Sequence, residues 1–442
     1  MKRTIFEAKT RILMRRDRRA LREMLAAERL PPQDLRALSD RRSVEIALHA
    51  FRTTAFYREH YTRAGFTESD IARAENFAHL PLLTKADLQG AGDGLVSSGS
   101  RASDRLPSRT GGSTGRPLKV YNDRSAPVAA LWWRIYSWWG IHPADDAAFI
   151  YRQKRRGLKK LMYDLEWWPT RHVLLDARGT TARDIEAFEA QVLRVRPRLL
   201  VGYVEGVDDF ASHVARAHVD LPRFHAISVT ASMLHPGQRA HIESALDAPV
   251  YDTYRSAEVP WIAAECAARD GLHILADRRR VDIVDAEGNA AEGTAVGDVA
   301  VTDFDNRVFP LVRYAIGDRT NRVVGPCECG RSLDRVGALE GRIADVLRTP
   351  TGRRVYGGLS AVLNGWPGAI RQFQIVQSAD FSVMIRYVAG PDPVRAQRAV
   401  AAAREEVANA LANEVRVGAA EVDAIESAGG KARLVISSAP DA

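Results

Sequence analysis

The segment from Thr180 to about Glu258 constrains the fold most, because helical patterns and short apolar runs alternate along it. Amphipathic helices are expected at 184–195, 207–219 and 236–246, and short strands at 199–203, 226–229 and 250–252. Such alternation is typical of βα units around a largely parallel sheet. Ligands of these sheets bind at the carboxyl ends of the strands, so we expect functional residues directly after them.

The segments that follow have different patterns. Residues 274–322 are β-rich, with glycine-containing turns expected at 287–289 and 296–298. Beyond Arg342, strands are expected at 373–376, 381–387 and 432–436 and a helix at 393–411, in a module of about a hundred residues, a typical domain size. The predicted fold class is α/β, with a large multi-sheet N-terminal domain over residues 1–340 and a small α+β domain over residues 341–442.

Composition limits the functional classes without choosing among them. The 442 residues carry a formal net charge of +8, which suits ATP, coenzyme A, a nucleic acid or a membrane surface as a partner. No apolar run is long enough for a transmembrane helix, and the basic N-terminus has no signal-peptide core. Three cysteines do not make a disulfide framework in so long a chain. We therefore expect a reducing, cytoplasmic setting.

Three features leave alternatives open. Residues 2–30, in a basic helical N-terminal region of residues 1–60, predict a surface helix or one that contacts a membrane or a partner. Residues 151–160 hold six cations and predict a solvated turn, or a contact with an acidic carrier, coenzyme A phosphates or a polyanion. Six of the eight tryptophans lie within 132–168, where core packing is the default and an aromatic wall for a substrate the alternative.

The loop from Ser108 to Val120 is the most distinctive binding candidate. Its thirteen residues contain three glycines, four hydroxyl side chains and three cations. Glycine permits positive φ, and successive backbone N–H groups with Ser and Thr hydroxyls form an anion site. Neither the Walker spacing nor the dinucleotide fingerprint is present. The loop predicts a site for a phosphate chain, with an ordinary solvated turn as the alternative.

Residues 110–117 resemble the phosphate-binding loop of the adenylate-forming ligases, the superfamily of acyl-coenzyme A synthetases, peptide-synthetase adenylation domains and luciferases. Within it, the phenylacetate–coenzyme A ligase and capsular-polysaccharide ligase-like branch is the most similar. Residues 80–88 resemble the Leu-Pro…Thr-Lys…Leu element that precedes the loop in this branch. The resemblance implies that the triphosphate is held by Thr110, Gly111, Gly112, Ser113, Thr114 and Gly115.

Two further motifs, which follow the loop in the sequence, also resemble motifs of this family. Residues 254–258 resemble the family's Tyr-Gly-x-Thr-Glu motif, which implies that Tyr254 and Arg255 line the nucleotide site and that Glu258 holds Mg²⁺. Residues 311–318 resemble its Arg-Tyr-x-x-Gly-Asp motif, in which Asp318 would accept hydrogen bonds from both ribose hydroxyls. Arg313, which opens that motif, and Glu258 are catalytic candidates.

The resemblance also implies a C-terminal domain that rotates between two half-reactions. Residues 341–347 resemble the hinge motif, whose Arg342 would reach the nucleotide, and residues 429–433 loosely resemble the Gly-Lys-x-x-Arg motif. Lys431 is the only lysine after Lys160, and its ammonium could meet a carboxylate–phosphate transition state as a point charge, which makes it the third catalytic candidate. The chain departs from the family pattern at Arg255, Ala257, Ser232 and Ala344.

The three cysteines, with one histidine, form a separate candidate metal site in the segment 266–330. Three thiolates and one imidazole are a recognised tetrahedral zinc set, and Cys266, His273, Cys327 and Cys329 supply it. The ligase branch shows a similar Glu-Cys…Leu-His…Cys-x-Cys-Gly pattern. We expect a structural zinc ion in this zinc-knuckle-like segment, with three buried free thiols as the alternative.

These expectations combine into one functional hypothesis. The protein would use ATP and Mg²⁺ to activate a carboxylic acid, with an aromatic acid as one candidate, as acyl-AMP with release of pyrophosphate. Coenzyme A would then attack the acyl-AMP. One alternative ends in an amide, with an amine as the acceptor. A second alternative, suggested by the departures from the family pattern, is a degenerate protein that binds a nucleotide without turnover. None of these hypotheses involves a nucleic acid.

Overall fold

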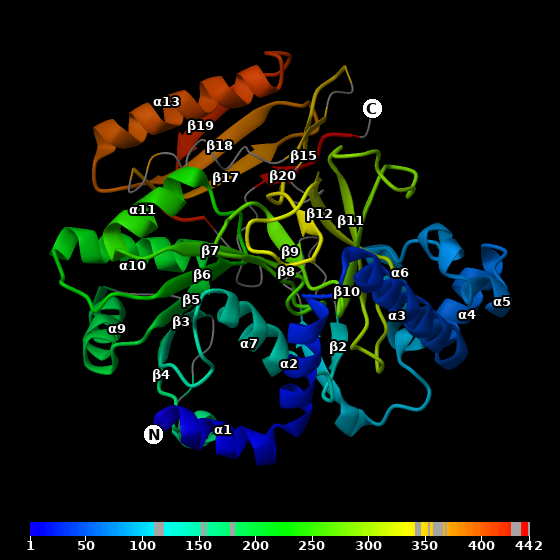
Figure 1. Ribbon diagram of the computed structural model, residues 1–442. Coiled ribbons are helices and arrows are strands. Elements are labelled where there is room, and N and C mark those ends of the chain that lie inside the picture. Colours follow the sequence, from blue (N-terminus) through cyan, green and yellow to red (C-terminus); the bar gives the residue numbers. More distant parts are fainter. Residues whose placement is uncertain are drawn as a thin grey trace.

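The computed structural model describes residues 1–109, 119–151, 155, 157–176, 182–340, 346–351, 354–356, 366, 369–425 and 435–440. Figure 1 shows a central sheet covered by helices, a group of N-terminal helices at one side and the C-terminal elements above the sheet. Within the described residues, no helix combines the length and apolar character that a membrane crossing requires.

The central sheet has nine strands in the order β13-β14-β9-β8-β7-β6-β5-β3-β4. Its parallel half consists of β3 (Ala147–Tyr151), β4 (His172–Asp176), β5 (Leu199–Tyr203), β6 (Ala226–Thr230) and β7 (Val250–Tyr254). The helices that connect these strands are α8 (Leu158–Trp167), α9 (Ala182–Val195), α10 (Val204–Ala217) and α11 (Pro236–Leu246). The predicted βα units and parallel sheet are therefore confirmed. The strand expected at 199–203 and the helix expected at 236–246 have the predicted bounds.

The other half of the central sheet is antiparallel and made of short strands, which are β8 (Ala263–Glu265), β9 (Leu272–Ile274), β14 (Arg335–Val336) and β13 (Arg322–Val323). A second antiparallel sheet contains β10 (Arg279–Val284), β11 (Gly297–Asp303) and β12 (Tyr314–Thr320). A hairpin is formed by β1 (Arg105–Arg109) and β2 (Lys119–Asp123). This architecture confirms the β-rich pattern expected for residues 274–322.

Of the two turns predicted in residues 274–322, the structure contains one, and the other prediction is wrong. Gly288 has φ +85° and lies in a turn, as predicted. Gly297 is instead the first residue of β11, and the turn before that strand is at Gly293. A Cβ atom at Gly297 would lie 2.5 Å from the carbonyl oxygen of Val284, so glycine serves close strand approach there and not a turn.

The N-terminal region is helical, but its helices are shorter than expected. Its elements are α1 (Lys2–Leu13), α2 (Arg15–Ala27), α3 (Pro32–Thr53), α4 (Ala55–Arg63), α5 (Glu68–Ile71), η1 (Ala74–His79), α6 (Lys85–Ala91), η2 (Gly92–Leu95) and η3 (Ala102–Asp104). The single helix expected at 2–30 bends at Met14, which lets Phe6 of α1 and Leu21 of α2 pack in one cluster with Trp133. Thr54 separates α3 from α4. Its hydroxyl caps α4 by accepting a hydrogen bond from the N–H of Tyr57 at 3.2 Å.

Helix α7 (Val128–Trp138) contains three of the eight tryptophans, and Trp139 follows it directly. Trp133, Trp138 and Trp139 are buried, as the core-packing prediction required. The ring of Trp139 stacks on that of Tyr251 of β7, with 4.8 Å between centroids, and its Nε1 donates to the carbonyl of Glu265. Trp168 behaves differently, because it is 55% exposed.

The C-terminal elements have a core of their own. A sheet in the order β19-β18-β17-β20 packs against one helix, and its buried residues include Ile375, Ile385, Val400 and Val407. The elements are β15 (Val346–Arg348), β16 (Arg354–Tyr356), β17 (Ile370–Gln377), β18 (Val383–Ala389), α13 (Pro393–Ala410), β19 (Val417–Glu421) and β20 (Val435–Ser437). The boundary expected at Gly341 lies outside the described residues.

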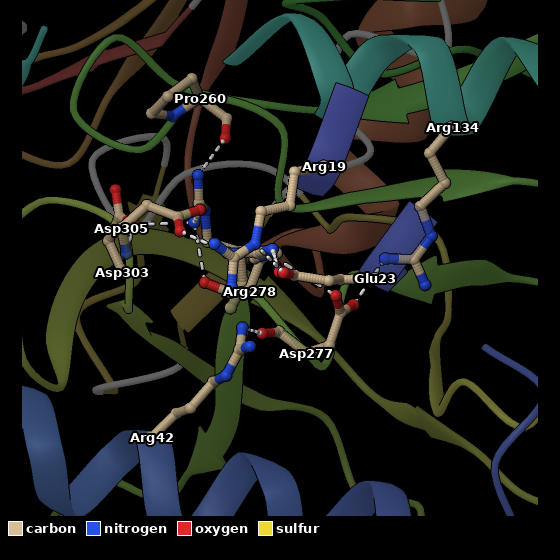
Figure 2. Close-up of polar contacts among 10 residues, drawn as sticks. Arg19, Glu23, Arg42, Arg134, Pro260, Asp277, Arg278, Asp303 and Asp305 are labelled. Atoms are coloured by element: carbon tan, nitrogen blue, oxygen red, sulfur yellow. Dashed lines mark hydrogen bonds and ion pairs between the residues drawn. The ribbon is translucent and has the colours of Figure 1, made fainter. Parts of the chain in front are cut away.

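A buried set of ion pairs joins the N-terminal helices to α7 and to the β10–β11 sheet (Figure 2). Arg134 of α7 is fully buried and donates to Glu28 at 3.0 Å and to Asp277 at 2.5 Å. Asp277 also accepts from Arg42 of α3, through its backbone carbonyl. Arg134 is thus linked directly to the segments around Glu28 and Asp277, and through Asp277 to α3.

The next two residues extend this network into the second sheet. Arg278 donates to Glu23 of α2 at 3.2 Å and to Asp305 at 3.1 Å. The fully buried Arg279 pairs with Asp303 at 2.7 Å and with Asp305 at 2.9 Å. Buried charges are tolerated only when each is paired, so the network fixes the relative positions of the elements that supply its members.

We predict that Arg134→Met lowers the free energy of unfolding by about 3 to 5 kcal/mol, because Glu28 and Asp277 lose their closest charge partner. Glu28 then keeps the more distant Arg331 at 3.5 Å, and Asp277 keeps Arg278 at 3.6 Å. The matched control is Arg63→Met, whose exposed pair with Glu59 is worth at most about 1 kcal/mol. Urea denaturation of both variants measures the difference, and equal midpoints would contradict the structural role given to Arg134.

Candidate functional site

The carboxyl end of β7 meets β12 of the second sheet. Tyr254 is buried, and its hydroxyl donates a hydrogen bond of 2.8 Å to Oδ2 of Asp318. Asp318 is partly exposed on β12, and a carboxylate oxygen has capacity for further donors. The structure thus brings together two predicted site residues that are separated by sixty-four positions in the chain.

Directly after β7 the chain makes a tight turn that presents Glu258. The hydroxyl of Ser256 accepts from the N–H groups of Glu258 at 3.2 Å and Val259 at 2.9 Å, and the N–H of Ser256 donates to the Val259 carbonyl. Serine suits this turn because its short side chain bonds to nearby backbone groups. Among the described residues, no cation pairs with the carboxylate of Glu258, which leaves its oxygens available to a metal ion.

The β1–β2 hairpin lies against the same turn. The hydroxyl of Ser108 donates to the carbonyl of Ala257 at 3.0 Å, and the amide of Asn122 donates to the same oxygen at 3.4 Å. In the antiparallel register, Arg109 of β1 pairs with Lys119 of β2. The two ends of the glycine-rich loop are therefore fixed next to the turn that contains Glu258.

Several predicted site residues lie outside the described residues. They include Arg342 and Lys431 and the loop residues Thr110, Gly111, Gly112, Ser113, Thr114 and Gly115. Of the positions at which the chain departs from the family pattern, Ala344 is also outside. Ser232 follows β6, just beyond Ala231, which has φ +78°.

Arg313 is described, and its surroundings favour a positioning role over the expected catalytic one. Its side chain is only 3% exposed, and its guanidinium donates to the carbonyls of Leu80 and, at 3.0 Å, Gly288. Its own N–H donates to the hydroxyl of Thr302 on β11. These bonds hold the segment before α6 and the β10–β11 turn against the start of β12, the strand that contains Asp318.

Arg255 points to a different group of residues from its neighbour Tyr254. Its guanidinium carbon lies 4.8 Å from the ring centre of Trp261 and 5.8 Å from that of Tyr151, which ends β3. Tyr151 in turn packs edge-on against Tyr203, the last residue of β5. Because β3 and β7 are separated by two strands of the sheet, Arg255 and Tyr151 approach one another across its carboxyl edge.

No carboxylate pairs with Arg255 in the part of the chain that the structure describes. An aromatic ring engages the face of a guanidinium and leaves its N–H groups free at the edge to bind an anion. Burial raises the pKa of the nearby Tyr151, and the positive charge of Arg255 opposes this increase. Tyr151 and Trp261 were missed by the sequence analysis, although the position of Tyr151 at a strand end was a usable signal.

The four predicted zinc ligands come together between β8, β9 and the segment before β14. Their ligand atoms all lie within 4.8 Å of one another. Cys266 Sγ and Cys327 Sγ are 3.6 Å apart, which is far from a disulfide and close to the separation of about 3.8 Å that two thiolates have on one tetrahedral zinc ion. Cys329 Sγ lies 3.2 Å from Nε2 of His273.

The second shell of this cluster orients the imidazole. Nδ1 of His273 is 3.1 Å from the carbonyl of Leu333, which can accept only if Nδ1 carries the proton. Nε2 then presents its lone pair to the thiols, the arrangement that metal-binding histidines adopt. Burial lowers the pKa of His273 to about 4, so the ring is neutral near neutral pH. The donor set and its support therefore fit a zinc ion.

The solved structures that resemble this fold are adenylate-forming enzymes. The structure of 2-hydroxyisobutyryl-CoA ligase in the postadenylation state, in complex with R3-HIB-AMP, matches with a TM-score of 0.75 and 20% identity, over 93% of this chain and 91% of that one. The amide bond synthetase McbA from Marinactinospora thermotolerans matches with a TM-score of 0.52 and 17% identity, over 88% and 91% of the two chains. The multi-sheet α/β fold predicted from the sequence is thereby confirmed.

Sequence comparison adds a curated relative. The phenylacetate-coenzyme A ligase of Thermus thermophilus is 25% identical over 366 residues, which cover 79% of each chain. No protein-family model matches the chain. The chain is accordingly similar to phenylacetate–coenzyme A ligases over most of its length and shares the fold of adenylate-forming enzymes, so the resemblance that its motifs predicted is confirmed.

A half-buried acidic group lies on β7 beside the candidate site. The N–H of Asp252 donates to Oε2 of Glu265 at 2.8 Å, and Arg239 binds both oxygens of Glu265 at 2.8 and 3.0 Å. Burial, followed by repulsion from Glu265, raises the pKa of Asp252 to about 7. The folded protein therefore keeps this proton up to about pH 7, whereas the unfolded chain loses it near pH 4. The contribution of Asp252 favours folding at low pH and is lost as the pH rises to about 7.

We predict that Asp252→Asn raises the melting temperature at about pH 8, because the amide removes the cost of a buried charge, and that the gain disappears toward about pH 4. Differential scanning fluorimetry across this range measures the effect. Asp220→Asn, at an exposed carboxylate, is the control and should show no such trend. A gain of equal size at both ends of the range would refute the raised pKa.

Proposed function

We propose that the protein is an AMP-forming carboxylate ligase, which activates a carboxylic acid with ATP and Mg²⁺ as acyl-AMP and then transfers the acyl group to coenzyme A. The observation that carries the proposal is the meeting of three distant segments. The hairpin that flanks the glycine-rich loop bonds to Ala257, and Tyr254 from the same turn region bonds to Asp318. One nucleotide could contact all three segments at once.

The proposed roles follow from the chemistry of each side chain. Asp318 would accept the ribose hydroxyls while Tyr254 holds one of its oxygens in place. Glu258 would provide an oxygen ligand for Mg²⁺ next to the phosphates, which the loop residues 110–115 would bind through N–H and hydroxyl groups. Lys431 and Arg342 would add positive charge at the α-phosphate, where negative charge grows during adenylation.

Arg255 is proposed to act at the acid and not at the nucleotide. It extends away from Tyr254 and Asp318 toward Tyr151 and Trp261, at the carboxyl edge of the parallel strands. An arginine held between aromatic rings suits a planar or aromatic acid that presents an acceptor to its N–H groups. The residue that replaces the family's glycine would therefore shape substrate choice.

The acceptor is proposed to be a thiol. The curated relative is a coenzyme A ligase and covers most of the chain, which supports coenzyme A. The fold likeness to an amide bond synthetase supports an amine as the second candidate acceptor. We further propose that the C-terminal elements form a separate, mobile domain that begins near Gly341, because their core contains no residue from the described N-terminal part.

We predict acid-dependent pyrophosphate release in a screen of carboxylic acids with ATP and Mg²⁺. Asp318→Ala and Glu258→Gln should each lower kcat/KM by at least about tenfold, whereas Glu287→Gln, at an exposed carboxylate in the β10–β11 turn, should leave it unchanged. In the same screen, Arg255→Gly should change the order of preferred acids more than the KM for ATP. ATP binding without release by any acid would instead identify a degenerate nucleotide-binding protein.

The second half-reaction is tested separately. Acyl-AMP of the preferred acid is incubated with enzyme and either coenzyme A or an amine, and the products are separated by mass. A thioester is the expected product. If an amide forms and no thioester does, the acceptor is an amine and not coenzyme A.

We also propose that Cys266, His273, Cys327 and Cys329 hold one structural zinc ion. With four protein ligands the ion would have no open position, so it would join loops and take no part in catalysis. It would connect β8 and β9 to the segment 327–329, in the antiparallel half of the central sheet, where β8 pairs with β7. Three reduced thiols in one cluster also favour a reducing compartment such as the cytoplasm.

We predict one zinc ion per chain by elemental analysis of purified protein. Cys327→Ser should release it and lower the melting temperature, since the remaining ligands lose their shared partner. The control is Ser332→Ala, close in sequence but outside the ligand set. Protein that is fully folded with no bound metal would favour three free thiols.

A further inference from the structure

The apolar side chains that the protein leaves exposed are concentrated on one face. Of the thirteen large hydrophobic residues that are exposed in the described chain, seven lie on α1, on α8 or directly after α8. On α8 and at its end they are 55 to 71% exposed: Leu158, Leu161, Met162, Leu165 and Trp168. On α1, Ile12 is 67% and Leu13 is 70% exposed. We call these seven residues the apolar face.

The spacing along α8 makes this face a continuous stripe. Leu158, Leu161, Met162 and Leu165 recur at intervals of three and four residues, the pattern that normally turns one side of a helix toward a core. No residue of α8 is buried, however. The stripe is therefore presented to the outside of the molecule.

The opposite side of α8 is fixed to the body of the protein. The ring of Trp167 packs 5.4 Å from that of Trp132 on α7, and the hydroxyl of Tyr163 lies 2.6 Å from Nδ1 of His172 on β4. Lys9 of α1 donates to the carbonyls at the end of α8, including that of Trp168 at 2.8 Å. Helix α1, which runs along the lower edge of Figure 1, is thereby joined to α8, and Ile12 and Leu13 lie one turn beyond Lys9.

Exposed cations border the apolar face, chiefly on α1. Residues 9–16, around Ile12 and Leu13, contain four cations and no acid, and Arg11, Arg15 and Arg16 are exposed. At the start of α8, Lys159 is exposed and Lys160 is half-exposed and pairs with Asp164 at 2.6 Å, while the exposed Glu166 lies near the end of the helix. Exposed leucines bordered by lysine and arginine, with a tryptophan at the edge, have the composition of a helix that lies in a membrane interface.

We propose that this face, formed by α8 and the end of α1, docks the protein onto an anionic lipid surface. The leucines and Met162 would enter the boundary between headgroups and acyl chains, while the cations contact anionic headgroups. Neither signal is sufficient alone, since stable peripheral binding takes apolar area and basic charge together. A second copy of the chain fits less well, because a twofold interface would oppose the same cations on both partners.

The test is co-sedimentation of the full chain with vesicles of phosphatidylcholine alone or mixed with phosphatidylglycerol. Binding is expected only with the anionic lipid and should weaken as salt screens the charges. The double variant Leu161→Ser, Leu165→Ser should partition at least about tenfold less, and Lys159→Glu should also weaken binding. Leu193→Ser on α9, 41% exposed and outside the face, is the control and should bind as the unmodified protein does.

Several results would overturn the proposal. Absence of binding to anionic vesicles would do so, as would unchanged binding by the double serine variant. Sedimentation equilibrium without lipid adds a further criterion: a dimer that the double variant abolishes would assign the face to a second copy. Because these side chains are exposed, the variants should keep the unmodified melting temperature, and pyrophosphate release in solution should be the same whether or not the face binds lipid.

Discussion

The interior of this protein is organised by a charge network whose members cannot be separated without large cost. Arg134 connects α7 to the end of α2 through Glu28 and to Asp277, which precedes β10. Arg278 and Arg279 continue the network into the aspartates beside β11. Paired charges in an interior are expensive to break even where they add little net stability, so they specify which surfaces meet. The second sheet, and with it β12, is held beside the central sheet in this way.

That placement decides where the candidate active site forms. Asp318 belongs to the second sheet and Tyr254 to the central one, and their hydrogen bond spans the junction. The hairpin reaches the same junction through Ser108 and Asn122, while Arg313 holds the start of β12 by bonding to distant carbonyls. A nucleotide fits such a junction, because its base, sugar and phosphates need different kinds of contact within a short distance. Catalytic residues from several elements can then converge on one molecule.

Two other parts of the protein, the antiparallel end of the central sheet and the apolar face on α1 and α8, depend on different interactions. The strands β8, β9 and β14 are only two or three residues long, and a metal ion shared by Cys266, His273, Cys327 and Cys329 would join them to the segment 327–329. The apolar face has the opposite character, since it leaves hydrophobic area in contact with water although the helix behind it is well anchored. A lipid surface would cover this area and would place the ligase at a membrane, with the candidate active site built from other elements.

The sequence by itself determined the elements that depend on neighbours in the chain. Alternating helical and apolar patterns predicted the parallel strands β5 to β7, and the residue types of the three cysteines and His273 predicted their cluster. It could not determine which distant side chains meet outside these motifs. The partners of Arg134 are 106 and 143 positions away, and the aromatic rings around Arg255 come from separate strands and loops. The apolar residues of α8 have a spacing that, in the sequence alone, predicts a buried helix face. Only the tertiary structure shows that nothing in the described chain covers them. Local pattern is set by backbone geometry, whereas burial and pairing depend on how the whole chain packs.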